Sequence, residues 1–228
     1  MANTFVPTRP ALLDSQPLQP LQPFNPTLLQ TALATPNIEL ALQQLALADD
    51  ISNIRDGEEN NTLLHSALLN DTNNTIGLVR ALAEKPGFPS TVNVKNSDGE
   101  LPLHIACRHI FSGSALYLLA QTENLNEGDN NDQTPLHIAC EAGNFQTMAA
   151  LVVELRHQNL PIDSKNKQGL SPCELAQKEG HKKIVKYLTI IRPAIRSSFH
   201  LDLQLPLPKL QTIPAEPQQT SRSRSFSI

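Results

Sequence analysis

The chain has 228 residues, a formal net charge of −4, three cysteines and no tryptophan. Aromatic residues make up 4% of it, which argues against a large core of aromatic side chains, whereas small helices need only its plentiful aliphatic residues. The mildly negative charge argues against general nucleic-acid binding, which depends on a basic surface.

The first 26 residues form a proline-rich leader. They hold six of the 18 prolines, and Gln16–Pro23 reads QPLQPLQP. Proline lacks a backbone donor and fixes φ, so this stretch favours extended, polyproline-like backbone over packed structure. We expect a disordered leader, with a proline-rich ligand motif as the alternative.

A short motif then returns along the chain. TLLQTAL starts at Thr27, TLLHSA at Thr62, LPLHIAC at Leu101, TPLHIAC at Thr134 and SPCELA at Ser171. The starts are 35, 39, 33 and 37 residues apart. Similarity at this period predicts an array in which each copy packs on its neighbours.

The motif resembles the T-P-L-H-x-A signature of ankyrin repeats. This resemblance implies an all-α solenoid of about five helix-turn-helix repeats with hairpin loops, and a role in binding other proteins. We place the repeats at residues 27–58, 59–97, 98–131, 132–168 and 169–192, with flanks 1–26 and 193–228 disordered. The first and last copies are degenerate, as expected for the caps of an open-ended solenoid.

In the first copy, TLLQTALA predicts a short helix that Pro36 ends. A second helix is expected over Ile38–Ala48, with Ile38, Leu42 and Leu45 on one apolar face.

Two middle copies carry extra residues. Lys85–Thr91 lengthens the link after the second copy's outer helix, and Arg108–Ser114 lengthens the turn between the third copy's helices. Insertions map to loops in such arrays. A functional edge and neutral drift remain equally open as explanations.

The fourth copy shows the repeat best. Thr134 is expected to cap a short helix with Pro135 just inside it, and this helix should end near Gly143. Phe145–Leu155 has apolar residues at helical spacing and predicts the second helix.

One backbone position links all four later copies. It lies three residues before the motif's proline position and holds Asn60, Gly99, Asp132 and Gly169. Ankyrin hairpins usually have glycine there, which implies a positive φ. Asn and Asp are the other residues that tolerate this region best, so we expect positive φ at all four.

The last copy has Cys173 and Glu174 in place of the motif's leucine and histidine. Its second helix, Lys182–Ile190, is expected to end before Pro193. The tail that follows has five prolines and ends in SRSRSFSI, which predicts disorder.

The three motif histidines, His65, His104 and His137, lie at equivalent positions. The family resemblance implies a structural role, in which each ring bonds backbone groups and joins one repeat to the next. Layers about 10 Å apart are too distant for two rings to share a metal, whose bonds are about 2 Å long.

We expect no enzymatic activity, cofactor, metal or small-molecule substrate. The chain has no Gly-x-Ser-x-Gly, phosphate loop or His-Glu-x-x-His motif. Cys107, Cys140 and Cys173 have neither metal nor disulfide spacing, and we interpret them as buried thiols in a reducing compartment. With no apolar run long enough to span a membrane and no signal peptide, a cytoplasmic location is expected.

The groove formed by hairpin tips and inner helices is the expected protein-binding surface. Its candidate residues are polar and have no evident core role, so substitution there is expected to alter binding and not stability. They are Lys95, Asp98, Arg108, His109, Asp129, Asn131, Asp132, Glu141, Lys165 and Lys167.

Charge is uneven along the repeats. Residues 25–131 hold 13 acidic and 5 basic residues, a net of −8, whereas residues 132–192 hold 6 acidic and 8 basic residues, a net of +2. This gradient favours a protein partner with a basic stretch, steered to the N-terminal half. The alternative is that the charge only keeps the surface soluble.

The pattern as a whole indicates a non-catalytic adaptor or inhibitor. Two narrower alternatives stay open: an inhibitor resembling the IκB group, which masks a transcription factor, or a bacterial effector acting in the cytosol or nucleus of a eukaryotic host.

Overall fold

The computed structural model describes residues 24–35, 37–69, 75–109 and 113–197. Most of the two flanks that the sequence predicts to be disordered lies outside these residues. Within the described part of the chain the regular structure is helical: α1 Pro26–Ala34, α2 Ile38–Leu47, α3 Leu63–Leu69, α4 Thr75–Ala83, α5 Phe88–Val92, α6 Pro102–Arg108, α7 Gly113–Leu119, α8 Pro135–Glu141, α9 Phe145–His157, α10 Pro172–Lys178 and α11 Lys182–Ser197.

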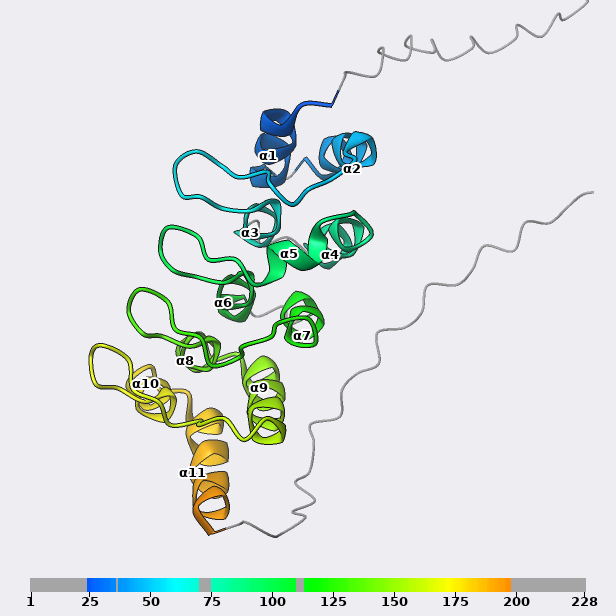
Figure 1. The fold of residues 1–228 in the computed structure, drawn as a ribbon. Helices are drawn as coiled ribbons and strands as arrows, with labels where there is room; N and C mark the ends of the chain where they lie inside the picture. Colours follow the sequence, from blue (N-terminus) through cyan, green and yellow to red (C-terminus); the bar gives the residue numbers. More distant parts are fainter. Residues whose placement is uncertain (1–23, 36, 70–74, 110–112, 198–228) are drawn as a thin grey trace, which may run out of the picture.

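The helices stand in two columns (Figure 1). The short inner helices α1, α3, α6, α8 and α10 stack on one another, and α2, α4, α7, α9 and α11 form the outer column. Hairpin loops project from the inner column, one after another along the array. The predicted all-α solenoid of helix pairs is confirmed.

The inner helices α1 and α10 begin where the sequence supplies a cap residue and a proline. The Asn25 side chain accepts hydrogen bonds from the backbone of Thr27 and Leu28, and Pro26 is the first helical residue. Glu174 accepts bonds from the backbone and hydroxyl of Ser171 at the start of α10. Helix α1 therefore starts one residue earlier than the boundary predicted for the leader.

The motif leucines form the centre of the core. Leu29, Leu64, Leu103 and Leu136 occupy the same motif position and are at most 1% exposed. Full burial of one leucine is worth about 1.5–3 kcal/mol. In the last repeat this position is Cys173, which is only partly buried, so the expectation of three buried cysteines is wrong for this one. Within the described residues, α10 packs on α8 and α11, and no further repeat lies beyond it.

The buried face of α2 differs from the prediction by one residue. Leu42 is 42% exposed, whereas Ala41, Gln44 and Leu45 are buried. Positions 41, 44, 45 and 48 are also at helical spacing, and α2 turns this stripe toward α1 and α4.

The insertion at 85–91 is not a simple loop, because it contains the start of helix α5. Phe88 is buried, and Lys85 Nζ donates to the carbonyl of Ala48 at 3.0 Å. The backbone of Ile51 donates to the carbonyl of Pro86 at 3.2 Å. This segment thus braces the first repeat against the second. Of the other predicted insertion, 108–114, residues 110–112 lie outside the described residues.

Helix α11 continues past Pro193 to Ser197, so the predicted end before this proline is wrong. A proline inside a helix removes one hydrogen bond and costs about 3 kcal/mol. Ile184, Leu188 and Ile191 are buried, and the helix packs on α9 and α10. This packing offsets the cost.

None of the helices in the described ranges has the length and apolar character needed to cross a bilayer.

Candidate protein-binding surface

Each hairpin loop is built around one Asp or Asn side chain. In the third loop, Asp129 Oδ1 accepts hydrogen bonds from the backbone N–H groups of Asn131 at 2.7 Å and Gln133 at 2.8 Å. The Asn96 and Asn166 side chains bind the corresponding two backbone N–H groups of their own loops. In the first loop, Asp56 accepts from the backbone of Glu59 and Asn61, one residue further along the chain. These bonds set the loop shape.

The predicted left-handed position is confirmed in all four hairpins. The φ angles are +55° at Asn60, +75° at Gly99, +57° at Asp132 and +75° at Gly169. The backbone requirement is met by two glycines, one asparagine and one aspartate.

Backbone hydrogen bonds join neighbouring hairpin tips. In each bond, an N–H group of the later loop donates to a carbonyl of the earlier one. The three bonds run from Ser97 to Glu59 at 2.8 Å, from Asn130 to Asp98 at 2.9 Å and from Lys167 to Asn131 at 2.9 Å. The tips therefore form a continuous edge and hold a fixed spacing.

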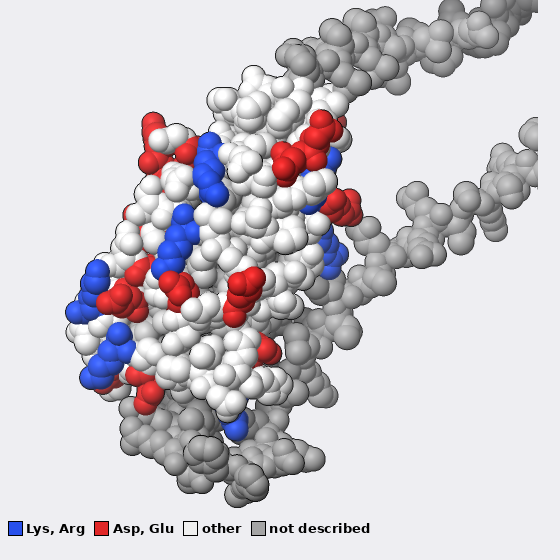
Figure 2. All heavy atoms as spheres, viewed as in Figure 1, with Lys and Arg blue, Asp and Glu red and all other residues white. Residues whose placement is uncertain are grey.

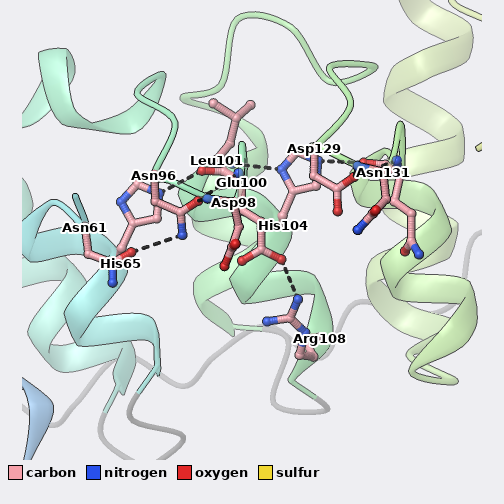
Figure 3. Close-up of polar contacts among 11 residues, drawn as sticks. Asn61, His65, Asn96, Asp98, Glu100, Leu101, His104, Arg108, Asp129 and Asn131 are labelled. Atoms are coloured by element: carbon pink, nitrogen blue, oxygen red, sulfur yellow. Dashed lines mark hydrogen bonds and ion pairs between the residues drawn. The ribbon is translucent and has the colours of Figure 1, made fainter. Parts of the chain in front are cut away.

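The motif histidines join the repeats below these tips. His65 Nε2 donates to the carbonyl of Glu100 at 3.0 Å (Figure 3). His104 Nε2 donates to the carbonyl of Gln133 at 3.0 Å. His137 repeats the contact with Leu170 at 3.2 Å. The other ring nitrogen, Nδ1, accepts a backbone N–H of its own repeat in all three cases. Both nitrogens of each ring are thus used within the fold.

Burial keeps these rings neutral. It lowers the pKa of His65 and of His104 from 6.5 to about 4, and it lowers the pKa of His137 as well. Among the described residues, no cluster of His, Cys, Asp and Glu is arranged to hold a metal ion. Cys107 is fully buried, and burial raises the pKa of its thiol, which disfavours the reactive thiolate.

An open hollow of about 640 Å³ lies on the face formed by the hairpins and the inner helices. Figure 2 shows acidic and basic side chains close together along the edge where the hairpins project. The lining residues come from three successive repeats: Glu59, Leu69, Asn96, Asp98, Glu100, Arg108, Asp129, Asn130, Asn131, Gln133, Ile138 and Glu141.

The floor of the hollow holds a partly covered ion pair. Arg108 Nη2 bonds Glu100 Oε1, and the Glu100 side chain is only 10% exposed (Figure 3). Five carboxylates and one guanidinium line the hollow. Because the guanidinium is paired, the remaining charge is negative.

Half of the predicted site residues line this hollow. They are Asp98, Arg108, Asp129, Asn131 and Glu141, whereas Lys95, His109, Asp132, Lys165 and Lys167 are not part of its lining. Sequence reasoning missed Leu69, which is 48% exposed. Aligning the repeats would have found it, because Leu69 is the counterpart of Arg108 and Glu141.

Several predicted site residues also hold the loops together. Lys95 Nζ donates to the carbonyl of Gly128 at 2.8 Å and pairs with Glu127 at 2.6 Å. Lys167 Nζ donates to the carbonyl of Asn130. Asp129 braces its loop and Asp132 has a positive φ, so at these four positions we now expect substitution to affect stability as well as binding. Loop backbone groups need partners, and nearby polar side chains supply them.

Comparison with known proteins agrees with this geometry. Residues 110–195 match the family model described as ankyrin repeats in three copies. The chain is 32% identical over 94 residues to the human transient receptor potential cation channel subfamily A member 1, covering 41% of this chain and 8% of that protein.

Two further relatives match longer stretches. Target of rapamycin complex 2 subunit AVO2 of Saccharomyces cerevisiae is 29% identical over 117 residues, covering 51% of this chain and 26% of that protein. NF-kappa-B inhibitor alpha of Rattus norvegicus is 26% identical over 156 residues, covering 68% of this chain and 49% of that protein. The chain spans less than half the length of each of these three relatives.

Ankyrin repeats form modules for contact between proteins, and the hollow described above lies where such modules present their surface. The repeated motif, the stacked helix pairs with their hairpin edge and the family match lead to one conclusion: this chain is an ankyrin-repeat protein.

Proposed function

We propose that the chain is a non-catalytic module that binds a partner protein in the hollow on its concave face. The observation that carries this proposal is the hollow itself, which crosses three repeats and has exposed side chains that the fold does not need. The Asp98 side chain is one of these, because only its backbone is used in the contact between hairpin tips. A surface of this width suits a segment of a protein better than a small molecule.

The charge of the hollow supports a basic segment in the partner. Glu59, Asp98 and Glu141 are exposed, and the lining cation Arg108 is already paired with Glu100. A basic segment would gain attraction at the hollow and faster association, both of which weaken with salt.

We place this function in a reducing, cytoplasmic compartment. All three cysteines are free thiols, and Cys107 and Cys140 are fully buried in the repeat core. Thiols of this kind act as small apolar residues and need no oxidising environment.

Affinity capture from a eukaryotic cell lysate tests the proposal. The double variant Asp98→Lys with Glu141→Lys reverses two exposed charges in the hollow. Glu84→Lys is the matched control, since Glu84 is exposed, directly follows outer helix α4 and lies outside the hollow. Asp129 and Asp132 are left unchanged, because their substitution would disturb the loop.

We expect proteins retained by the wild type and by Glu84→Lys to be lost by the double variant, while the circular dichroism of all three stays the same. Equal capture by the double variant and the wild type would move the binding surface away from the hollow and overturn the proposal.

A second candidate is inhibition of a transcription factor. NF-kappa-B inhibitor alpha covers more of this chain than the other two relatives described above. The test is DNA binding by purified NF-kappa-B with and without the chain. Loss of DNA binding with the wild type, and its return with the double variant, would support this candidate, and DNA binding unchanged by the chain would exclude it.

A further inference from the structure

Three side chains at one repeat position meet in the hollow. Leu69, Arg108 and Glu141 are the last residues of α3, α6 and α8, and each lies seven residues after the first residue of its motif. All three line the hollow, and the three helices stack in this order. The hollow therefore presents an apolar, a basic and an acidic side chain in a row.

Each of these three side chains has exposed surface or hydrogen-bonding groups that a ligand could contact. Leu69 is 48% exposed, which is unusual for leucine in a chain whose core leucines are fully covered. Within the described residues, no hydrogen bond or ion pair reaches the Glu141 carboxylate. The ring of His181 bonds the backbone carbonyl of Glu141 and not its side chain. Arg108 pairs with Glu100, but a guanidinium has five N–H donors and one carboxylate does not use them all.

The stacking sets the spacing of the row. Packed helices lie about 8–10 Å apart, and a chain in the polyproline II conformation advances about 3.1 Å per residue with three residues per turn. Consecutive repeats therefore face every third residue of a polyproline II segment, because these residues share one side of it, and the row from Leu69 to Glu141 matches about seven residues.

We propose that the hollow selects a segment of the partner in the polyproline II conformation, with an apolar side chain, an amide side chain and a basic side chain at every third position. The apolar side chain packs on Leu69, and the basic one pairs with Glu141. This inference rests on the proposed function and adds to it the chemistry and register of the ligand.

The middle position is an amide because of its two neighbours. Arg108 can donate a hydrogen bond to an amide oxygen, and Asp98, which also lines the hollow, can accept one from the amide nitrogen. A carboxylate there would lie near Asp98 and Glu100, and a second cation would lie near Arg108. Asn or Gln satisfies both sides without either repulsion.

Fluorescence anisotropy with short labelled peptides tests the register. The matched peptide places leucine, glutamine and arginine at every third position in a serine and threonine background. A shifted peptide of the same composition places them at every fourth position. Each peptide is also made with the reversed order of residues, because the direction in which a segment would bind is not fixed. The comparison uses the tighter-binding order of the matched peptide and that of the shifted peptide.

We expect the matched peptide to bind about tenfold more tightly than the shifted one. The variant Glu141→Lys should prefer glutamate to arginine at the basic position, so that a matched peptide with glutamate in place of arginine binds this variant more tightly than the original matched peptide does. Leu69→Ser should weaken the matched peptide, and the control Glu84→Lys should leave it unchanged. Equal binding of matched and shifted peptides, or a preference for arginine that survives Glu141→Lys, would overturn the inference.

The capture experiment separates this inference from the proposed function. If peptides show no register while the double variant still loses its captured partner, the row does not select the ligand and the hollow remains the binding surface. If neither experiment depends on the hollow, both proposals are wrong.

Discussion

At the scale of single residues, the motif histidines show how a titratable side chain serves as a structural one. His65 and His104 each use one ring nitrogen within their own repeat and the other for a carbonyl of the next. Water is excluded from both rings, which are 0% exposed. Burial disfavours a charge on these rings, which is the physical reason for their lowered pKa, and a proton on Nδ1 would also break the first bond.

These histidines predict a pH dependence of stability. The pKa of His65 and of His104 is about 4 in the folded protein, whereas an unperturbed histidine, as in the unfolded chain, has a pKa of 6.5. Between these two pH values the unfolded chain therefore binds more protons than the folded one. The free energy of unfolding should therefore be highest above pH 6.5 and fall as the pH drops toward 4. The loss approaches about 1.4 kcal/mol per pH unit for each proton taken up on unfolding.

Urea unfolding at several pH values measures this effect. His104→Gln should lower the slope of stability against pH, besides destabilising the fold. His157→Gln is the control, because that side chain is 72% exposed on α9. A slope that His104→Gln leaves unchanged would show that other groups carry the pH dependence.

At the scale of elements, the hairpin loop is the unit that repeats best. Its turn residue differs in identity between copies, yet φ is positive in each. What changes from loop to loop is how closely the next repeat approaches this residue. At Gly99 an added Cβ would lie 2.8 Å from the backbone nitrogen of Asn130, whereas at Gly169 there is open space.

Alanine at these two glycines should therefore have unequal effects. Both substitutions place a side chain at positive φ, at a cost of about 1–2 kcal/mol. Gly99→Ala adds a collision with the backbone of the next loop and should lower the free energy of unfolding further than Gly169→Ala. Urea unfolding measures the free energy of unfolding of both variants. Equal decreases would mean that the loop containing Asn130 moves away from the added Cβ without loss of stability.

At the scale of the whole molecule, the array is a chain of neighbour contacts. Helices α6 and α8 have a repeat packed on either side, whereas the first repeat and α11 lie at the ends. In such solenoids, stability is approximately a sum of repeat and interface terms. Opening is therefore expected to begin at the ends.

Amide hydrogen exchange of the native protein checks this order. Amides of α6 and α8 should exchange most slowly, and those of α2 and α11 earlier, because the end repeats lose one interface when they open. Uniform protection along the array would contradict the prediction and indicate that the repeats open as one cooperative unit.

The sequence by itself determined the number and type of the repeats, the starts of helices such as α8 and α10, and the positive φ of all four hairpins. These features are local and periodic, so a cap residue, a proline or a turn residue at a regular spacing is enough to specify them.

Only the tertiary structure decided which polar side chains form hydrogen bonds or ion pairs within the fold and which can bind a ligand. Asp129 and Glu141 are both acidic and both line the hollow, but the Asp129 carboxylate braces its loop, whereas within the described residues no hydrogen bond or ion pair reaches that of Glu141. The exposure of Leu42, the course of α11 past Pro193 and the pairing of Arg108 with Glu100 likewise depend on neighbours distant in sequence or on packing against them. These features depend on contacts between residues of different repeats or helices. A sequence pattern describes neighbours along the chain and does not specify such contacts.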